Sequence, residues 1–126
     1  MPNWQPNWED VEFDHAKAQA AIAECNNSAR GLDSALAGLA TEATTLDANG
    51  AWTGRYRTDF DAARPVVEHD GVATRTALLD LARAIATAAA QATTEQAGRV
   101  ADRERWRQEK AQEDAQRPSG GGRIPE

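Results

Sequence analysis

Apolar residues recur at alternating gaps of four and three through most of the first half of this chain. The series is Val11, His15, Ala18, Ile22, Cys25, Ala29, Leu32, Leu36, Leu39, Ala43 and Leu46. Its average spacing of about 3.5 residues is typical of a helix that packs lengthwise on another helix. The first half therefore predicts one long helix over about residues 9–47.

A second repeat of the same kind runs through the other half. One row of its heptad holds Phe60, Val67, Thr74, Leu81 and Ala88, and the other holds Gly71, Leu78, Ile85, Ala92, Arg99 and Trp106. This repeat predicts a second helix over about residues 55–115. Pro65 lies inside it, where a proline removes one backbone hydrogen bond and clashes with the preceding turn, so we expect a kink near Pro65.

The two repeats are separated by residues with turn chemistry. Asn49 and Gly50 tolerate the left-handed conformation that ends a helix, and we expect the turn at about residues 48–54. Trp52 would place a large apolar ring with a polar N–H at the bend, and Gly54 would permit a close approach of other atoms. The sequence therefore predicts an all-α fold, an antiparallel helical hairpin over residues 9–116.

Large core side chains are scarce, because the 40% of residues that are hydrophobic are mostly alanine. Two helices packed only on each other leave much apolar surface in water, so we expect pairing with a second hairpin, of the same or another chain, into a four-helix bundle. The residues expected to pack within or between hairpins are Ile22, Cys25, Leu32, Leu36, Leu39, Leu46, Phe60, Val67, Leu78, Leu81 and Ile85.

The tripeptide Trp52-Thr53-Gly54 between two helices, together with the run from Leu78 to Ala86, resembles the WXG100 or ESAT-6-like family of type VII secretion. The resemblance covers roughly residues 9–100. It implies a small, dimerising, non-enzymatic hairpin that is a substrate or co-secreted partner of that system, with Trp52 and Gly54 in a recognition end. A secretion ATPase or an effector would then be a further partner.

The chain departs from that family in its export signal, which is a tyrosine followed four residues later by Asp or Glu beyond the second helix. The only tyrosine is Tyr56, and Phe60 stands four residues after it. We therefore expect either export attached to a partner that carries the signal, or retention in the cytoplasm. The alternative function is an intracellular adaptor or chaperone-like partner of a secreted toxin or effector.

Other function classes find little support in the residues. A net charge of −6 argues against a nucleic-acid partner, the start of the chain lacks the pattern of a secretory signal peptide, and no apolar run is long enough for a membrane span. We expect no cofactor, no metal and no enzyme activity. Cys25 lies on the apolar series as a small hydrophobe, with an intermolecular disulfide or a reactive thiol as alternatives. Glu68-His69-Asp70 cannot converge, because adjacent helical residues point apart.

The ends of the chain carry three tryptophans outside the hairpin turn. Pro2-Asn3-Trp4-Gln5 is nearly repeated by Pro6-Asn7-Trp8-Glu9, and residues 1–8 form a Trp/Pro-rich tail. Trp4 and Trp8 either dock on a partner or fold back on the protein, or Trp8 packs on the first turn of helix 1 while Trp4 stays loosely ordered. Trp106 either docks on a partner or packs on the folded-back tail. Residues 117–126 are Gly-rich, and we expect them to be disordered.

Overall fold

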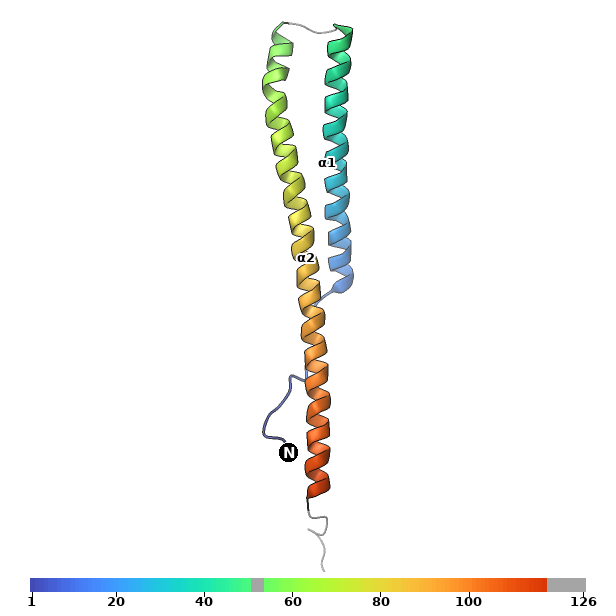
Figure 1. Ribbon diagram of the computed structural model, residues 1–126, viewed down its shortest axis with the longest axis vertical. Coiled ribbons are helices and arrows are strands. Elements are labelled where there is room, and N and C mark those ends of the chain that lie inside the picture. Colours follow the sequence, from blue (N-terminus) through green and yellow to red (C-terminus); the bar gives the residue numbers. More distant parts are fainter. Residues whose placement is uncertain (51–53, 118–126) are drawn as a thin grey trace, which may run out of the picture. The chain divides into compact units, whose positions relative to one another are not determined.

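The computed structural model describes residues 1–50 and 54–117. It contains two helices, α1 (His15–Asn49) and α2 (Arg55–Gln116), and no strand within those ranges. The first part of α2 runs back alongside α1 (Figure 1), which confirms the all-α helical hairpin. Trp52 and the Gly-rich residues 118–126 lie outside the described residues, so what was expected of them stays a prediction.

α1 begins six residues later than the apolar spacing predicts. Asp14 has extended backbone angles, and its side chain accepts a hydrogen bond of 2.9 Å from the backbone N–H of Lys17, as a helix N-cap does. The residues before Asp14 are not helical. Val11 fits the spacing of the helical series, but its backbone N–H is bonded to Gln96 at 2.7 Å, and this bond belongs to an extended segment.

The break between the helices lies within the predicted turn. Gly50 adopts a left-handed conformation with φ of 60°, and its N–H donates to the carbonyl of Asp47 at 3.1 Å. Gly54 also has a positive φ, of 75°, directly before α2. Apart from its neighbours in the chain, no described residue places an atom within 4 Å of where a Gly54 Cβ would stand. The positive φ is itself a reason for glycine at this position, and the close approach expected there stays a prediction.

α2 continues through Pro65 as one helix of 62 residues. Pro65 is exposed, so its ring displaces no core side chain. The helix does not divide into two segments at this position. The kink expected near Pro65 stays a prediction.

The chain forms two compact units. One is Asp14–Ala88, which holds α1 and the first part of α2, and we call it the hairpin unit. The other combines Met1–Phe13, which we call the strap, with the chain from Ala89 onward; we call residues 89–116 of α2 the arm. Each unit is described by itself below.

Small side chains form the buried part of the hairpin unit. The residues that are less than 9% exposed there are Ala18, Cys25, Ala29, Ala43 and Ala82. The leucines of the α1 series and Ile22 are half-buried beside them. The predicted α1 face is thus the face that packs, and Cys25 takes the place of a small hydrophobe within it.

The packed face of α2 agrees with one predicted row and differs from the other. Gly71, Leu78 and Ile85 are half-buried, as expected. The neighbouring row lies one residue later than predicted, at Glu68, Arg75 and Ala82. Val67 and Leu81 are 52% and 51% exposed. They therefore lie on the flank of α2, and their packing between two hairpins stays a prediction.

Ion pairs and a close packing contact join α1 to α2 within the hairpin unit. The Nη1 of Arg57 lies 2.6 Å from the Asp47 carboxylate, and the Nε of Arg75 lies 2.6 Å from the Asp33 carboxylate. A Cβ on Gly71 would stand 3.0 Å from the Cδ2 of Leu36, so the missing side chain makes room for that leucine. Small residues on α2 thus let the larger residues of α1 approach.

Candidate functional site

Trp106 is the centre of a tryptophan cluster between the strap and the arm. Its indole N–H donates to the main-chain carbonyl of Trp4 at 2.9 Å. Its ring meets that of Trp8 edge to face, with centroids 5.3 Å apart and an interplanar angle of 88°. Trp4 in turn donates its indole N–H to Glu109 at 3.0 Å. The strap is thus folded back on the arm, and Trp4 is held by hydrogen bonds on both its main chain and its side chain.

Two arginines of the arm lie over the tryptophans of the strap. The guanidinium carbon of Arg105 is 4.3 Å from the ring centroid of Trp4, and that of Arg107 is 5.6 Å from the centroid of Trp8. Both distances are within the range of cation–π attraction. Arg105 also lies 3.5 Å from the carboxylate of Glu109, four residues later on the same helix. The carboxylate holds the guanidinium in place over the ring.

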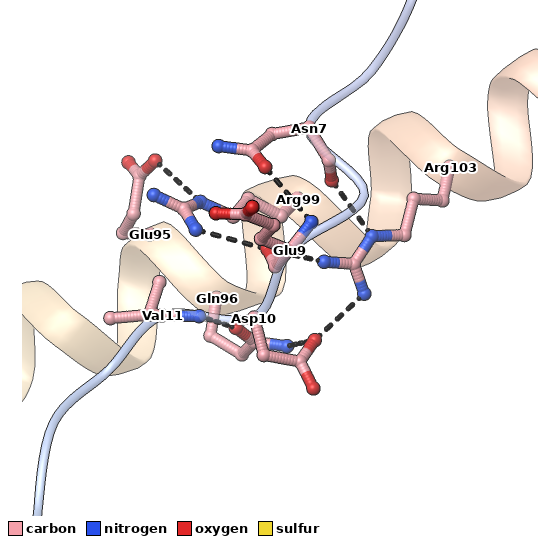
Figure 2. Close-up of polar contacts among 8 residues, drawn as sticks. All are labelled: Asn7, Glu9, Asp10, Val11, Glu95, Gln96, Arg99 and Arg103. Atoms are coloured by element: carbon pink, nitrogen blue, oxygen red, sulfur yellow. Dashed lines mark hydrogen bonds and ion pairs between the residues drawn. The ribbon is translucent and has the colours of Figure 1, made fainter.

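Arg103 binds the strap with all three nitrogens of its guanidinium, two of them to main-chain carbonyls and one to a carboxylate (Figure 2). Its Nε donates to the carbonyl of Asn7 at 2.9 Å, and its Nη2 donates to the carbonyl of Glu9 at 2.6 Å. Its Nη1 donates to the Asp10 carboxylate at 2.9 Å. The Arg103 side chain is only 13% exposed. Such a planar, multidentate contact fixes the register of the strap on the arm.

Gln96 and Arg99 extend this contact along the same face of the arm (Figure 2). Gln96 accepts from the N–H of Val11 at 2.7 Å and donates to the Asp10 carboxylate at 2.9 Å. Arg99 donates to the carbonyl of Glu9 at 3.0 Å and to the Glu95 carboxylate, four residues earlier on the helix, at 3.1 Å. The arm therefore contacts the main chain of the strap at three alternate residues, as expected for an extended segment.

The local sequence explains why strap and arm take these conformations. Proline fixes φ and disfavours a helix in the residue before it, so Pro2 and Pro6 keep the strap extended, and both are buried. In the arm, the residues that face the strap are spaced by three, four and three: Gln96, Arg99, Arg103 and Trp106. This spacing places them on one face of the helix.

Asp10 is the group whose titration the site changes most clearly. Hydrogen bonds from the side chains of Gln96 and Arg103, followed by the charge of Arg103, hold the pKa of Asp10 below its ordinary value. Arg99 adds a smaller effect in the same direction. At neutral pH the carboxylate is therefore ionised and accepts both hydrogen bonds.

The sequence identified the three tryptophans of this site but not its polar part. Arg99 and Arg103 both bind strap carbonyls, and the apolar pattern gave no indication of this role. Asp10 and Gln96 carried no expectation. The heptad spacing could have indicated this polar part. The inner row of α2 that holds Ala82 and Ala89 continues, at steps of seven residues, to Gln96 and Arg103. A polar residue on an inner row indicates a polar partner.

The other sequence candidates do not converge on a second site. Glu68 is paired with Arg64 at 2.6 Å, whereas His69 and Asp70 are exposed on α2. A shallow, open depression beside them is lined by residues of this one helix: Pro65, Glu68, His69, Val72 and Ala73. Cys25 is buried and free. Among the described residues, no cluster of three His, Cys, Asp or Glu side chains is placed to hold a metal.

Neither helix, over the part of the chain that the structure describes, is apolar for long enough to cross a membrane. Comparisons of the chain with protein-family models, with curated proteins and with solved structures give no match. The resemblance to the WXG100 family therefore rests on the residues around Trp52 and on the pattern of the second helix alone.

Proposed function

We propose that this chain is a non-enzymatic interaction protein whose hairpin pairs with a second small helical hairpin into a four-helix bundle. The observation that carries the proposal is the size of the buried side chains. In the hairpin unit the buried set consists of alanines and Cys25, and no large side chain of the described residues is fully buried. Burying apolar surface stabilises a protein by about 25 cal/mol per Å². The exposed part of each half-buried leucine can therefore contribute further stability when a partner helix covers it.

The flank of α2 that carries Tyr56, Val67 and Leu81 is the proposed pairing surface. These residues are 81%, 52% and 51% exposed. Their separations of eleven and fourteen residues are close to three and four whole turns at about 3.6 residues per turn, so they follow one side of the helix. Valine, leucine and tyrosine on one such line suit a helix of similar pattern, from the same or another chain.

The cellular role proposed for this pair is that of a substrate or co-secreted partner of a type VII secretion system. The support is the position of Trp52-Thr53-Gly54 directly before α2 and after the end of α1. Trp52 and Gly54 would form part of the recognition end, and a secretion ATPase would be the reader. The single tyrosine, Tyr56, lies at the start of α2, so the partner chain would supply the export signal.

The alternative is an intracellular adaptor that holds a secreted toxin or effector by its own hairpin. The observation that favours it is the same lack of a tyrosine signal after α2 in this sequence. Both roles use the same pairing surface. They differ in where the chain is found.

Substitutions on opposite sides of α2 test the pairing. Leu81 and Val72 are nine residues apart, about two and a half turns, and both are about half exposed. We expect Leu81→Asp to convert the pair to a monomer in light scattering, alone or co-expressed with the product of the adjacent open reading frame. Val72→Asp is the matched control and should leave the pair intact. A monodisperse wild-type monomer in both settings would contradict the proposal.

The location of the chain separates the two roles. Secretion predicts that the chain appears in culture supernatant and disappears from it when the secretion ATPase is deleted or Trp52→Ala is introduced. The adaptor predicts that the chain stays with the cells while its toxin is exported. A pair that forms normally but never leaves the cell would reject the secreted role and retain the pairing.

A further inference from the structure

The arm recognises a repeated sequence unit in the strap. Pro2-Asn3-Trp4-Gln5 and Pro6-Asn7-Trp8-Glu9 share three of four residues in register. Both prolines are buried, and Trp106 contacts both units, through the carbonyl of Trp4 and the ring of Trp8. One arm residue thus lies where the two units meet. Such double recognition is more selective than the covering of a helix by a loose tail.

Much of the recognition is directed at the main chain of the strap. Arg99, Arg103 and Gln96 bind two carbonyls at Glu9 and Asn7 and one N–H at Val11. These bonds need an extended backbone and do not depend on the side chains of those residues. The side chains of the tryptophans and of Asp10 then select the sequence and the register. This combination is typical of a peptide-binding surface.

Charge on the face that contacts the strap favours the same kind of ligand. The arm as a whole carries six acidic and five basic side chains, but Arg99 and Arg103 lie on the contacting face. Arg103 pairs there with the Asp10 carboxylate at 2.9 Å. An extended segment with repeated Pro-Asn-Trp units followed by a carboxylate is therefore complementary to this face of the arm.

We propose that the arm is a peptide-binding surface for extended Pro-Asn-Trp segments, and that it accepts the strap of a second copy of this chain in exchange for its own. The contacts made by an exchanged strap are identical to those made within one chain. The main free-energy cost of exchange is therefore entropic: a strap binds its own arm at the high effective concentration set by the tether, and this advantage is lost when it binds the arm of a second chain. This proposal is independent of the secretion role and of the flank that carries Tyr56, Val67 and Leu81.

The first experiment measures binding of a labelled peptide of residues 2–11 to the full-length chain by fluorescence anisotropy. In the wild-type chain its own strap competes, so the experiment uses a chain with Trp4→Ala and Trp8→Ala. We expect this strap-weakened chain to bind the peptide at least about tenfold more tightly than the wild-type chain does. No binding to the strap-weakened chain, or equal binding of a scrambled peptide, overturns the proposal.

Variants of the arm show whether the peptide binds where the strap does. In the strap-weakened background, Trp106→Phe removes the indole donor but keeps an aromatic ring, and Arg103→Lys removes the guanidinium fork but keeps the positive charge. Each is expected to weaken peptide binding about fivefold or more. Arg83→Ala, an exposed arginine of α2 outside the arm, is the control and should change nothing. Unchanged binding in both arm variants overturns the proposal.

The second experiment tests exchange between whole chains. An isotope-labelled chain with Arg103→Lys and Trp106→Phe has an intact strap and a weakened arm, and it is mixed with the unlabelled strap-weakened chain. Its own weakened arm gives the labelled Val11 amide, which donates to Gln96, only partial protection, so any added protection on mixing comes from a strap bound in trans. We expect its hydrogen exchange to slow on mixing, also when both chains carry Leu81→Asp. An unchanged exchange rate shows that the strap does not exchange, and overturns that part of the proposal.

Discussion

The indole N–H of Trp106 donates a hydrogen bond to the main-chain carbonyl of Trp4, which lies 102 residues earlier in the chain. This bond ties the first residues of the sequence to the far part of α2. It also places Trp106 against both repeated units of the strap, because its ring contacts Trp8. The arm is therefore a site with a ligand already in place, and its individual contacts can be tested.

Replacing Trp106 with phenylalanine tests the contribution of this hydrogen bond. A smaller aromatic ring remains, but the donor to the Trp4 carbonyl is lost, and a net contribution of about 1 kcal/mol is expected from such a bond. The strap should then open about five times more often. The measurement is hydrogen exchange at the Val11 amide, which should become faster by that factor, while Arg83→Ala leaves it unchanged. An unchanged rate in the Trp106 variant would show that the indole N–H does not hold the strap.

Acid should release the strap through Asp10. Because the pKa of Asp10 is lowered in the folded protein by its bonds to Gln96 and Arg103, the stabilisation is fully present above the unfolded-state pKa, about 4. It is lost as the pH falls from there through the lower folded-state value. We expect tryptophan fluorescence to report strap opening over this range below about pH 4.

The matched variant for this pH dependence is Asp10→Asn. It keeps a similar size and an acceptor oxygen but carries no charge. At neutral pH it should hold the strap less firmly, and on acidification the difference from the wild-type chain should vanish. If the two chains differ equally at pH 7 and below pH 3, ionisation of Asp10 plays no part in strap binding.

The hairpin could be read from the sequence because its α1 pattern is long and regular. The faces around Cys25 and Leu32 were predicted correctly, and the break fell where Gly50 takes a left-handed conformation. The second row of α2 was predicted one residue early, because Leu81 is more hydrophobic than Ala82. In the structure the smaller residue packs inside, and the larger one lies on the flank.

The polar part of the strap site could not be read in this way. Apolar periodicity identifies surfaces that bury hydrocarbon, whereas Arg103 and Gln96 bind backbone groups, which every residue carries. The same limit explains the late start of α1. Val11 continues the apolar spacing, and only the bond from its N–H to Gln96 shows that it belongs to the strap.

Gly71 and Gly38 should respond differently to alanine. Both are helical, and alanine is favoured over glycine in a helix by about 1 kcal/mol. Gly38 has open space around it, so Gly38→Ala should stabilise the protein by about that amount. At Gly71 the new methyl would meet Leu36 at 3.0 Å, and moving that side chain offsets the gain. Urea denaturation at one protein concentration should therefore show a smaller or negative change for Gly71→Ala.

Equal stabilisation by the two alanines would contradict the close Gly71 contact. It would show that Leu36 repacks at no cost, and that the two helices do not need a glycine at this point. A larger residue sharpens the comparison, because Gly71→Leu cannot be accommodated by a small movement of Leu36. We expect it to destabilise the hairpin by about 2 kcal/mol, whereas Gly38→Leu should be close to neutral.

Pro65→Ala should stabilise α2 directly. Proline at this position has no N–H to donate to the carbonyl of Asp61, and inside a helix it costs about 3 kcal/mol relative to alanine. Because Pro65 is exposed, its removal costs no buried contact, and a gain of about 1–3 kcal/mol is expected in denaturant unfolding. Val66→Ala, at the exposed neighbouring residue, is the control and should change stability by less than about 0.5 kcal/mol.

If Pro65→Ala gains stability and also weakens pairing through the Leu81 flank, the proline shapes α2 for its partner. If it gains no stability, α2 already accommodates the ring by bending, and the kink expected at Pro65 accounts for the lost hydrogen bond.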